Sequence, residues 1–256
     1  VKKRFWGYET QLYCWTKPKT SSPVEYPNLV DAIGLNPPGV DFAEVAVRAG
    51  KTLADAGARR SKLRGDMQYW VGQKKDKFFT PMTKIEFEPV THYRVEQVGY
   101  QGSVNGAILV DGAYYCHAMA DLPEVVNATR DYNAGKINSE QLARHIATRA
   151  DYLNTDRERV RPGGRRLLQC GAAKGERSTL KCHLKNDDLD LPYSAIQLPL
   201  TVVSAGPMCD NKYSTTIPFE ERSKLEQPIQ YMSAEWFDVF GQRNVIEKFN
   251  DDLKMT

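Results

Sequence analysis

The order of segments in the first 66 residues constrains the fold more than any other feature of the sequence. Residues 3–16 are rich in aromatic side chains in partial alternation, which predicts a long strand. An apolar run at residues 29–35, a helical periodicity over residues 42–56 and a short strand at residues 61–65 follow. Asp41 is placed to cap the helix, and Gly57 to end it. Strand, strand, helix and strand in this order predict an α/β sheet with a crossover helix.

The rest of the chain alternates between short strands and helices. A hairpin is predicted at residues 107–110 and 113–116, because the Asp111-Gly112 pair between them is a strong two-residue turn signal. Further short strands are predicted at residues 84–88, 92–97, 167–170, 179–184 and 198–203. Helices are predicted at residues 122–132, 139–152 and 233–255.

Composition excludes several classes of protein. The 256 residues are 41% hydrophobic and 26% charged, which indicates a globular chain rather than a disordered one. No run approaches the roughly 18 apolar residues of a membrane span, and the first residues lack a signal core, so we expect a cytoplasmic protein. The sequence has no glycine-rich phosphate loop and no Gly-x-Ser-x-Gly elbow. The net charge of +3 leaves nucleic acid open as a partner, so local charge must decide.

The last predicted helix carries one acidic and two basic residues on a single face. With about 100° of rotation per residue, Arg243, Glu247 and Lys254 return to within about 40° of one direction. One carboxylate held between two cations suits a divalent metal ion together with a phosphodiester. The alternative is a solvated helix face with an ordinary Arg–Glu pair.

The spacing around this face resembles a known signature. Phe240-(2)-Arg243-(3)-Glu247-(6)-Lys254 is similar to the Tyr-(2)-Arg-(3)-Glu-(6)-Lys pattern of bacterial insertion-sequence transposases that use a DDE catalytic triad. The surrounding Gly-Gln-Arg-Asn-Val-Ile-Glu-Lys-Phe-Asn-Asp-Asp-Leu-Lys resembles their glutamate helix throughout. Residues 2–9 resemble the second strand of their RNase H-like core, and Asp66-Met-Gln-Tyr resembles the motif of their second aspartate. Residues 92–99 resemble a later segment of actinobacterial members, so the resemblance runs from Lys2 to Lys254.

The resemblance implies an α/β fold with an RNase H-like mixed sheet and flanking helices. Asp66 and Glu247 lie 181 positions apart, further than a compact core needs, so we expect a mixed α+β insertion. The expected division is residues 1–98 and 231–256 for the core and 99–230 for the insertion.

The resemblance also implies a function, namely metal-dependent DNA cleavage and strand transfer at transposon ends in association with the nucleoid. Asp66 and Glu247 would hold Mg²⁺ or Mn²⁺, while Arg243 and Lys254 would contact phosphates of transposon-end and target DNA. Tyr69 would pack beneath the site or belong to the ordinary core. By analogy with related transposases, a homodimer on DNA is expected.

The chain departs from the family pattern in two ways. Phe240 replaces the signature tyrosine, which removes a phenolic hydrogen bond and keeps the ring. The family's first aspartate lies on a strand before residues 2–9, and Asp31, the earliest aspartate here, comes too late in the topology. We therefore expect a transposase fragment that alone cuts DNA poorly or not at all. The alternative is an inactive remnant that binds only DNA or a partner.

Asp111 competes with Asp66 for the catalytic position, because it also follows an apolar strand. Its other interpretation is a turn residue in an Asp-Gly hairpin.

A basic loop in the predicted insertion is a candidate for DNA contact. Its arginines are Arg157, Arg159, Arg161, Arg165 and Arg166. They would neutralise phosphates, or else form a solvated loop.

Four of the five cysteines fall in the predicted insertion: Cys116, Cys170, Cys182 and Cys209. Four thiolates suit a structural tetrahedral Zn²⁺ site, although the spacing contains no C-x₂-C pair. His117 and His183 directly follow two of them and are alternative ligands. The other interpretation is reduced thiols packed as small hydrophobic groups.

Overall fold

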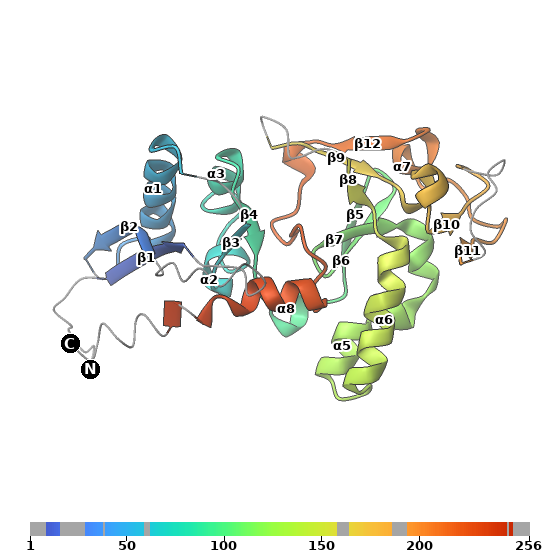
Figure 1. Cartoon of the computed structure of the whole chain (residues 1–256), viewed down its shortest axis with the longest axis horizontal. Helices are drawn as coiled ribbons and strands as arrows, with labels where there is room; N and C mark the ends of the chain where they lie inside the picture. Colours follow the sequence, from blue (N-terminus) through green and yellow to red (C-terminus); the bar gives the residue numbers. More distant parts are fainter. Residues whose placement is uncertain are drawn as a thin grey trace, which may run out of the picture. The chain divides into compact units, whose positions relative to one another are not determined.

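A computed structural model describes residues 9–15, 29–37, 39–58, 62–157, 164–185, 194–244 and 246–247. The chain forms two compact units: unit 1 comprises residues 1–92 and 234–256, and unit 2 comprises residues 93–233. Both are built from helices and small sheets, so the fold is mixed α/β (Figure 1). Unit 2 is inserted in sequence between two parts of unit 1. The boundaries lie 6 residues (98 − 92) and 3 residues (233 − 230) from the expected ones.

Unit 1 begins with a strand pair covered by a helix. β1 (Glu9–Trp15) pairs antiparallel with β2 (Leu29–Asn36), and α1 (Phe42–Asp55) packs against both. The helix begins at Asp41, whose carboxylate accepts a hydrogen bond from the Ala43 N–H at 3.1 Å. These elements confirm the predicted order of strand, strand and helix.

Close packing holds α1 on the strand pair. Gly34 of β2 leaves no room for a side chain, since a Cβ there would lie 2.7 Å from Val45 Cγ1 of α1. Gln11 and Tyr13 of β1 donate side-chain hydrogen bonds to α1 carbonyl oxygens, each at 2.8 Å. The helix and the edge of β1 are therefore fixed relative to each other.

The second part of unit 1 is a parallel strand pair with short helices. β3 (Lys62–Arg64) pairs with β4 (Glu88–Val90), and α2 (Met67–Trp70) and α3 (Phe79–Lys84) connect them. α8 (Ala234–Gly241), which lies 144 positions beyond β4 (234 − 90), packs beside it. Among the described residues, unit 1 thus contains two two-stranded sheets instead of the single mixed sheet expected.

Three sequence predictions in unit 1 and at its boundary were wrong. Residues 84–88 are not one strand, because Lys84 ends α3; Pro81 is tolerated there as the third residue of the helix, where its missing N–H has no helical partner. Residues 92–97 are irregular and end in a 3₁₀ turn, η1 (Val95–Gln97), which belongs to unit 2. The last helix is interrupted: α8 ends at Gly241, a poor helix former, and residues 242–243 form a turn before helical residues at 244 and 246–247. Residues 245 and 248–255 of that prediction lie outside the described part.

Unit 2 opens with an antiparallel meander. β5 (Tyr100–Val104), β6 (Ala107–Val110) and β7 (Ala113–Cys116) pair in sequence order, and the predicted Asp111-Gly112 hairpin is confirmed. Both turn residues have positive φ, 44° and 83°, as a type I′ turn requires. All eight residues of β6 and β7 are buried, so this hairpin is the centre of the unit 2 core.

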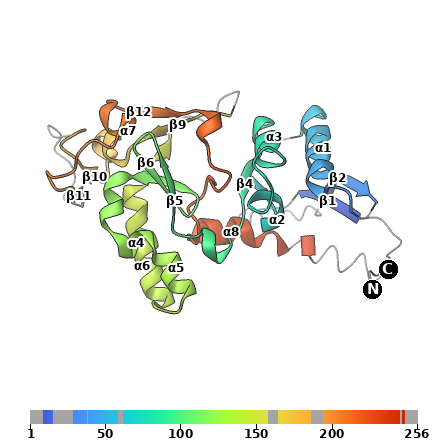
Figure 2. The same cartoon turned by 180° about the vertical axis from the view of Figure 1, so that it is seen from behind.

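Helices and short strands complete unit 2. α4 (Pro123–Val126), α5 (Ala128–Asn133) and α6 (Ser139–Tyr152) pack together, as both views show (Figures 1 and 2). The predicted helix at residues 139–152 is confirmed, with Asn138 as its cap. β8 (Thr155–Asp156), β9 (Arg166–Gln169) and β12 (Ser214–Ile217) form one sheet. β10 (Leu180–Lys181) pairs with β11 (Ile196–Gln197), and α7 (Pro207–Asp210) precedes β12. No helix in the described ranges is long and apolar enough to cross a membrane.

Candidate active site

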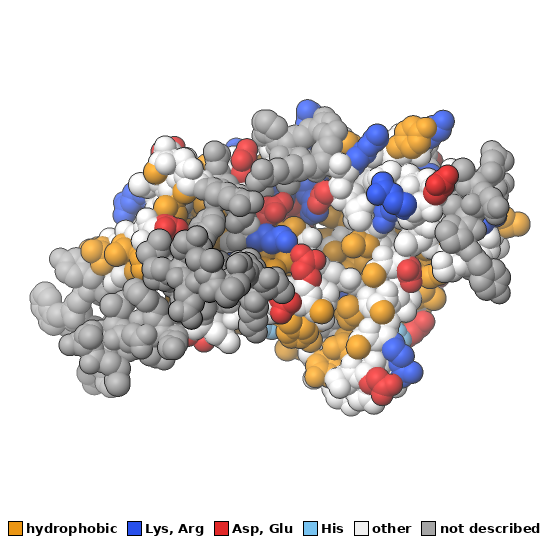
Figure 3. Space-filling view, in the orientation of Figure 1, with side chains coloured by type: hydrophobic (Ala, Val, Ile, Leu, Met, Phe, Trp, Pro, Cys, Tyr) orange, Lys and Arg blue, Asp and Glu red, His pale blue; other side chains and the backbone are white. Residues whose placement is uncertain are grey.

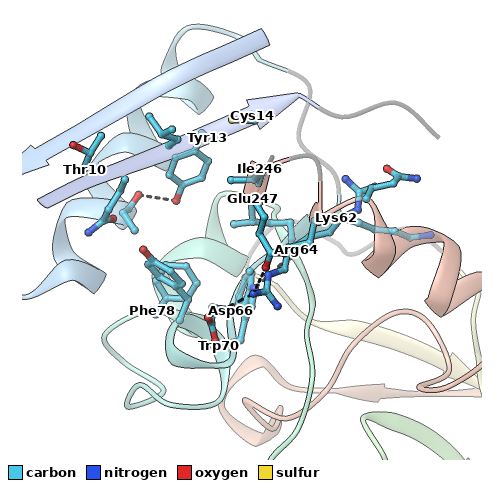
Figure 4. Close-up of a pocket in the computed structure, with 18 residues that line it drawn as sticks. Thr10, Tyr13, Cys14, Lys62, Arg64, Asp66, Trp70, Phe78, Ile246 and Glu247 are labelled. Atoms are coloured by element: carbon cyan, nitrogen blue, oxygen red, sulfur yellow. Dashed lines mark hydrogen bonds and ion pairs between the residues drawn. The ribbon is translucent and has the colours of Figure 1, made fainter. Parts of the chain in front are cut away.

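Asp66 and Glu247 lie in the same pocket of unit 1, although 181 positions separate them in sequence (247 − 66). Asp66 comes two residues after β3 and caps α2, where its carboxylate accepts a hydrogen bond from the Gln68 N–H at 3.4 Å. Glu247 lies six positions after the last residue of α8 (247 − 241). Figure 4 shows the two acidic side chains pointing toward each other across the pocket.

Arg243 joins the two carboxylates. Its Nη2 atom lies 2.8 Å from Glu247 Oε1 and 3.9 Å from Asp66 Oδ2. The side chains of Asp66 and Glu247 are about half exposed, 49% and 56% respectively. Such ion pairs contribute little to stability. A metal cation can therefore replace Arg243 beside the carboxylates, or an anion can replace the carboxylates beside Arg243, at a small cost in free energy.

Two strand edges form opposite walls of the pocket. Residues 10–14 of β1 line it on one side and residues 62–66, from β3 to Asp66, on the other. Consecutive residues of a strand point to alternate faces of the sheet, so a pocket on one face would be lined by every second residue. Here consecutive residues line the pocket, which indicates that the edge of each strand borders it. The cavity has a volume of about 300 Å³ and separates the two small sheets of unit 1.

Cations from β3 add to the charge of the pocket. Lys62 and Arg64 both line it, and Lys62 also pairs with Glu235 at 3.1 Å. Burial lowers the pKa of Arg64 from its usual value. Three cations and two carboxylates line the cavity, which gives a net charge of +1. Sequence reasoning missed Lys62 and Arg64, although their alternation with Asp66 at every second residue was a signal.

Aromatic rings form the floor of the pocket. Tyr69 packs edge-on against Phe42, with ring centroids 5.1 Å apart, and against Phe78 at 5.4 Å. Trp70 is buried and donates its indole N–H to the Leu63 carbonyl oxygen at 3.2 Å. Burial, and then the Asp66 charge, raise the pKa of Tyr69, so its hydroxyl stays protonated at neutral pH. Tyr69 therefore both lines the pocket and packs in the core.

Phe240 packs against Arg243 but does not line the pocket. Its ring stacks on Trp236 at 4.7 Å and meets His92 edge-on at 4.5 Å. The Arg243 guanidinium lies 5.8 Å from the centroid of the Phe240 ring. Burial, and then the charge of Arg243, lower the pKa of His92. Lys254, the remaining predicted phosphate contact of this segment, lies outside the described residues.

The structure divides the predicted basic loop of unit 2. Arg157 and Arg165 are exposed, whereas Arg159 and Arg161 lie outside the described residues. Arg166 is buried and paired with Asp156 at 2.5 Å, so its proposed DNA contact is corrected to a structural role. Arg157 lies 5.9 Å from the centre of the Tyr213 ring. Figure 3 shows several basic side chains over β9, β12 and α7.

Asp111 has a structural role. Its carboxylate accepts hydrogen bonds from the Gly99 N–H at 2.5 Å and from the Thr129 hydroxyl at 2.6 Å. It also pairs with Arg149 at 2.5 Å, and both side chains are fully buried. Both carboxylate oxygens are thus engaged in the interior of unit 2, which removes Asp111 as a rival to Asp66.

The four cysteines of unit 2 are all buried and all in the reduced state. Cys209 Sγ lies 3.4 Å from the His117 Nδ1 atom. Within the described ranges, no three His, Cys, Asp or Glu side chains form a closed metal-holding group.

Comparisons with protein-family models, with curated proteins and with solved structures return no match to this chain.

Proposed function

We propose that unit 1 is the catalytic domain of a DDE transposase, which performs metal-dependent cleavage and transfer of DNA strands. The proposal rests on one observation: Asp66 and Glu247, distant in sequence, share one pocket and one bridging cation. The order of β1, β2, α1, β3, β4 and α8 is consistent with an RNase H-like core interrupted by an insertion.

The chemistry of the pocket fits a divalent ion. Carboxylate oxygens are the ligands that Mg²⁺ prefers, and Asp66 and Glu247 both line the pocket with about half of each side chain exposed. In the described structure the Arg243 guanidinium stands between the carboxylates and balances part of their charge. A bound Mg²⁺ would supply charge neutralisation and an activated hydroxyl for attack on a phosphodiester.

The residues of the chain have distinct tasks in this proposal. Asp66 is oriented by its cap on α2, and Glu247 by its pairing with Arg243. Asp66 and Glu247 would hold the metal ion, and Arg243 would then be available to contact a phosphate, for which its planar guanidinium is suited. Lys62 and Arg64 extend the positive wall along which a DNA backbone would lie.

The pocket also has a place for the strand that carries the first aspartate in the transposase pattern. The strand of the first aspartate would lie between the edges of β1 and β3, where the cavity separates the two small sheets. Such a strand would join the two sheets into one and bring a third carboxylate to the site. We therefore expect this chain by itself to bind metal ions and DNA but to cut DNA weakly or not at all.

A measurement of Mn²⁺ binding by electron paramagnetic resonance tests the proposal. We expect Asp66→Asn and Glu247→Gln each to weaken Mn²⁺ binding by about tenfold or more. Asp238→Asn, which neutralises an exposed carboxylate on α8, is the matched control and should leave binding unchanged. Equal Mn²⁺ affinity in all four proteins would contradict a shared metal site.

A second function, DNA or partner binding without catalysis, is favoured by the presence of only two acidic residues in the described lining of the pocket. The two functions differ in Mn²⁺-dependent nicking of supercoiled DNA. Nicking that disappears in Glu247→Gln supports the enzyme. DNA binding that is indifferent to Mn²⁺ and to both substitutions supports the remnant.

A further inference from the structure

The cysteines of unit 2 share a local geometry that reduced core cysteines do not require. Cys116 is the last residue of β7, Cys170 directly follows β9, and Cys182 directly follows β10. A tight turn follows each one: η2 (His117–Asp121), η3 (Gly171–Ala173) and a turn at residues 183–185. Cys116 and Cys170 have nearly the same extended backbone, with φ of −56° and −61°.

Each turn directs a backbone N–H at the sulfur. The backbone of Ala118 hydrogen-bonds to Cys116, that of Ala172 to Cys170, and that of Leu184 to Cys182. In all three cases the donor is the second residue after the cysteine. Cys209 differs, because it lies within α7 and its backbone hydrogen bond comes from Ala205, four residues earlier. Such donors suit a thiolate, the form that binds metal ions, although the hydrogen bond with Cys170 raises the pKa of Cys116 and burial raises the pKa of Cys182 and of Cys209.

The four sulfurs are also neighbours in space. The Cys116 thiol hydrogen-bonds to the sulfur of Cys170, and Cys209 interacts electrostatically with Cys116, Cys170 and Cys182. Lys185 and Lys174 place positive charge near Cys170. Two imidazoles stand at the edge of the group: His117 contacts Cys209, and the Nδ1 atom of His183 is buried without a hydrogen-bond partner.

We infer that Cys116, Cys170, Cys182 and Cys209 form a structural zinc site that ties together the ends of β7, β9 and β10 and the helix α7. Soft thiolate ligands with tetrahedral freedom select Zn²⁺ over the hard cations expected in unit 1. As they stand, the described side chains do not converge on a point. Binding requires the sulfurs to rotate inward and to release their protons to solvent.

The site has a clear structural purpose. The strands β8, β10 and β11 contain only two residues each, too few to hold a sheet by themselves. One ion would bridge chain segments 54, 12 and 27 positions apart (170 − 116, 182 − 170, 209 − 182). Because metal binding is coupled to folding, the ion would stabilise this half of unit 2 directly.

The test is the metal content of the whole chain, purified under reducing conditions. We expect about one Zn²⁺ per chain by elemental analysis. Replacement by Co²⁺ should give the thiolate charge-transfer band of a sulfur-rich site. Cys182→Ser should lose the band, and Cys14→Ser, which changes the cysteine of unit 1, should keep it.

A measurement on the unmodified chain covers the case in which Cys182→Ser does not fold. A strong chelator should speed amide hydrogen exchange around all four cysteines and leave α1 of unit 1 unchanged. The inference is overturned if the reduced chain holds no zinc and gives no Co²⁺ band. It is equally overturned if thiol titration finds two of the cysteines already joined in a disulfide. None of these outcomes bears on the carboxylate pocket of unit 1.

Discussion

The two units use their charged residues in opposite ways. In unit 1, Asp66, Arg243 and Glu247 meet at a pocket, and a third to a half of each side chain is exposed. In unit 2, Asp111 and Arg149 meet in the core with 1% and 0% exposure. Exposed ion pairs contribute little to stability and exchange readily with ligands, whereas a buried pair cannot lose one partner without a large penalty. The comparison indicates that the charges of unit 1 are available for function and those of unit 2 hold the fold.

Unit 2 contains a second buried cluster of charged side chains. Glu226 is buried beside Arg166 and Arg222, and it also accepts a hydrogen bond from the Tyr114 hydroxyl at 2.8 Å. The resulting network connects β7, β9 and the segment after β12. Two arginines of a chain with an expected DNA-binding role are thus committed to the interior.

The largest effect is expected from breaking the Asp111–Arg149 pair. Arg149→Met keeps the volume of the side chain but leaves Asp111 buried without its cation. We expect unit 2 to lose about 3–5 kcal/mol of unfolding free energy. Hydrogen exchange of β7 and α6 measures this loss unit by unit, with α1 as the internal control.

The double variant Arg149→Met/Asp111→Asn separates charge from packing. Because Asn removes the buried charge, we expect it to restore part of the lost stability. If Arg149→Met lowered the unfolding free energy of unit 2 by less than about 1 kcal/mol, the Asp111–Arg149 pair would not be a major source of its stability.

Local patterns in the sequence predicted much of this fold. The hairpin at Asp111-Gly112, the helices at residues 42–56 and 139–152 and the order of the first elements follow from turn chemistry and periodicity. The ion pair of Asp111 did not, because Arg149 is 38 positions away and falls beside an apolar helix face. Nothing local distinguishes a buried arginine from a solvated one, and for the same reason the sequence predicts a DNA contact at Arg166.

Local spacing predicted one part of the candidate site, and the part that depends on long-range packing did not follow from it. Helical spacing alone places Arg243 and Glu247 on one face, and the structure pairs them at 2.8 Å. That Asp66 would join them depends on long-range packing, which only the family resemblance suggested. Lys62 and Arg64 alternate with Asp66 along the chain, and this pattern indicates the pocket only once the position of Asp66 is known.

An intermediate effect is expected from pH, and it tests whether unit 1 also depends on a half-buried titratable group. His92 meets the stacked rings of Trp236 and Phe240 edge-on, and its pKa is lowered by burial and by Arg243 from the usual value of 6.5. Below pH 6.5 the unfolded chain therefore takes up a proton that the folded chain resists. The unfolding free energy of unit 1 should fall as pH decreases from 6.5 toward the folded pKa, and be fully present above 6.5.

Replacing the imidazole isolates this dependence on pH. His92→Phe retains a ring against the stacked pair of Trp236 and Phe240 and should flatten the slope of unit 1 stability between pH 7 and pH 5. His145→Gln, a change in unit 2, is the control and should leave that slope as it is. An unchanged slope in His92→Phe would assign the acid sensitivity of unit 1 to other groups.

The smallest effect on stability is expected from Arg243→Met. This substitution tests most directly the difference between the exposed charges of unit 1 and the buried charges of unit 2. The substitution matches Arg149→Met in chemistry, but the ion pairs that it breaks are partly exposed and screened by salt. We expect unit 1 to lose less than about 1 kcal/mol, and less still in concentrated salt. Mn²⁺ should bind more tightly, because the cation that competes for Asp66 and Glu247 is gone, while DNA should bind more weakly. If Arg243→Met instead destabilised unit 1 as strongly as Arg149→Met destabilises unit 2, Arg243 would be a structural residue, and the pocket would have no cation to release.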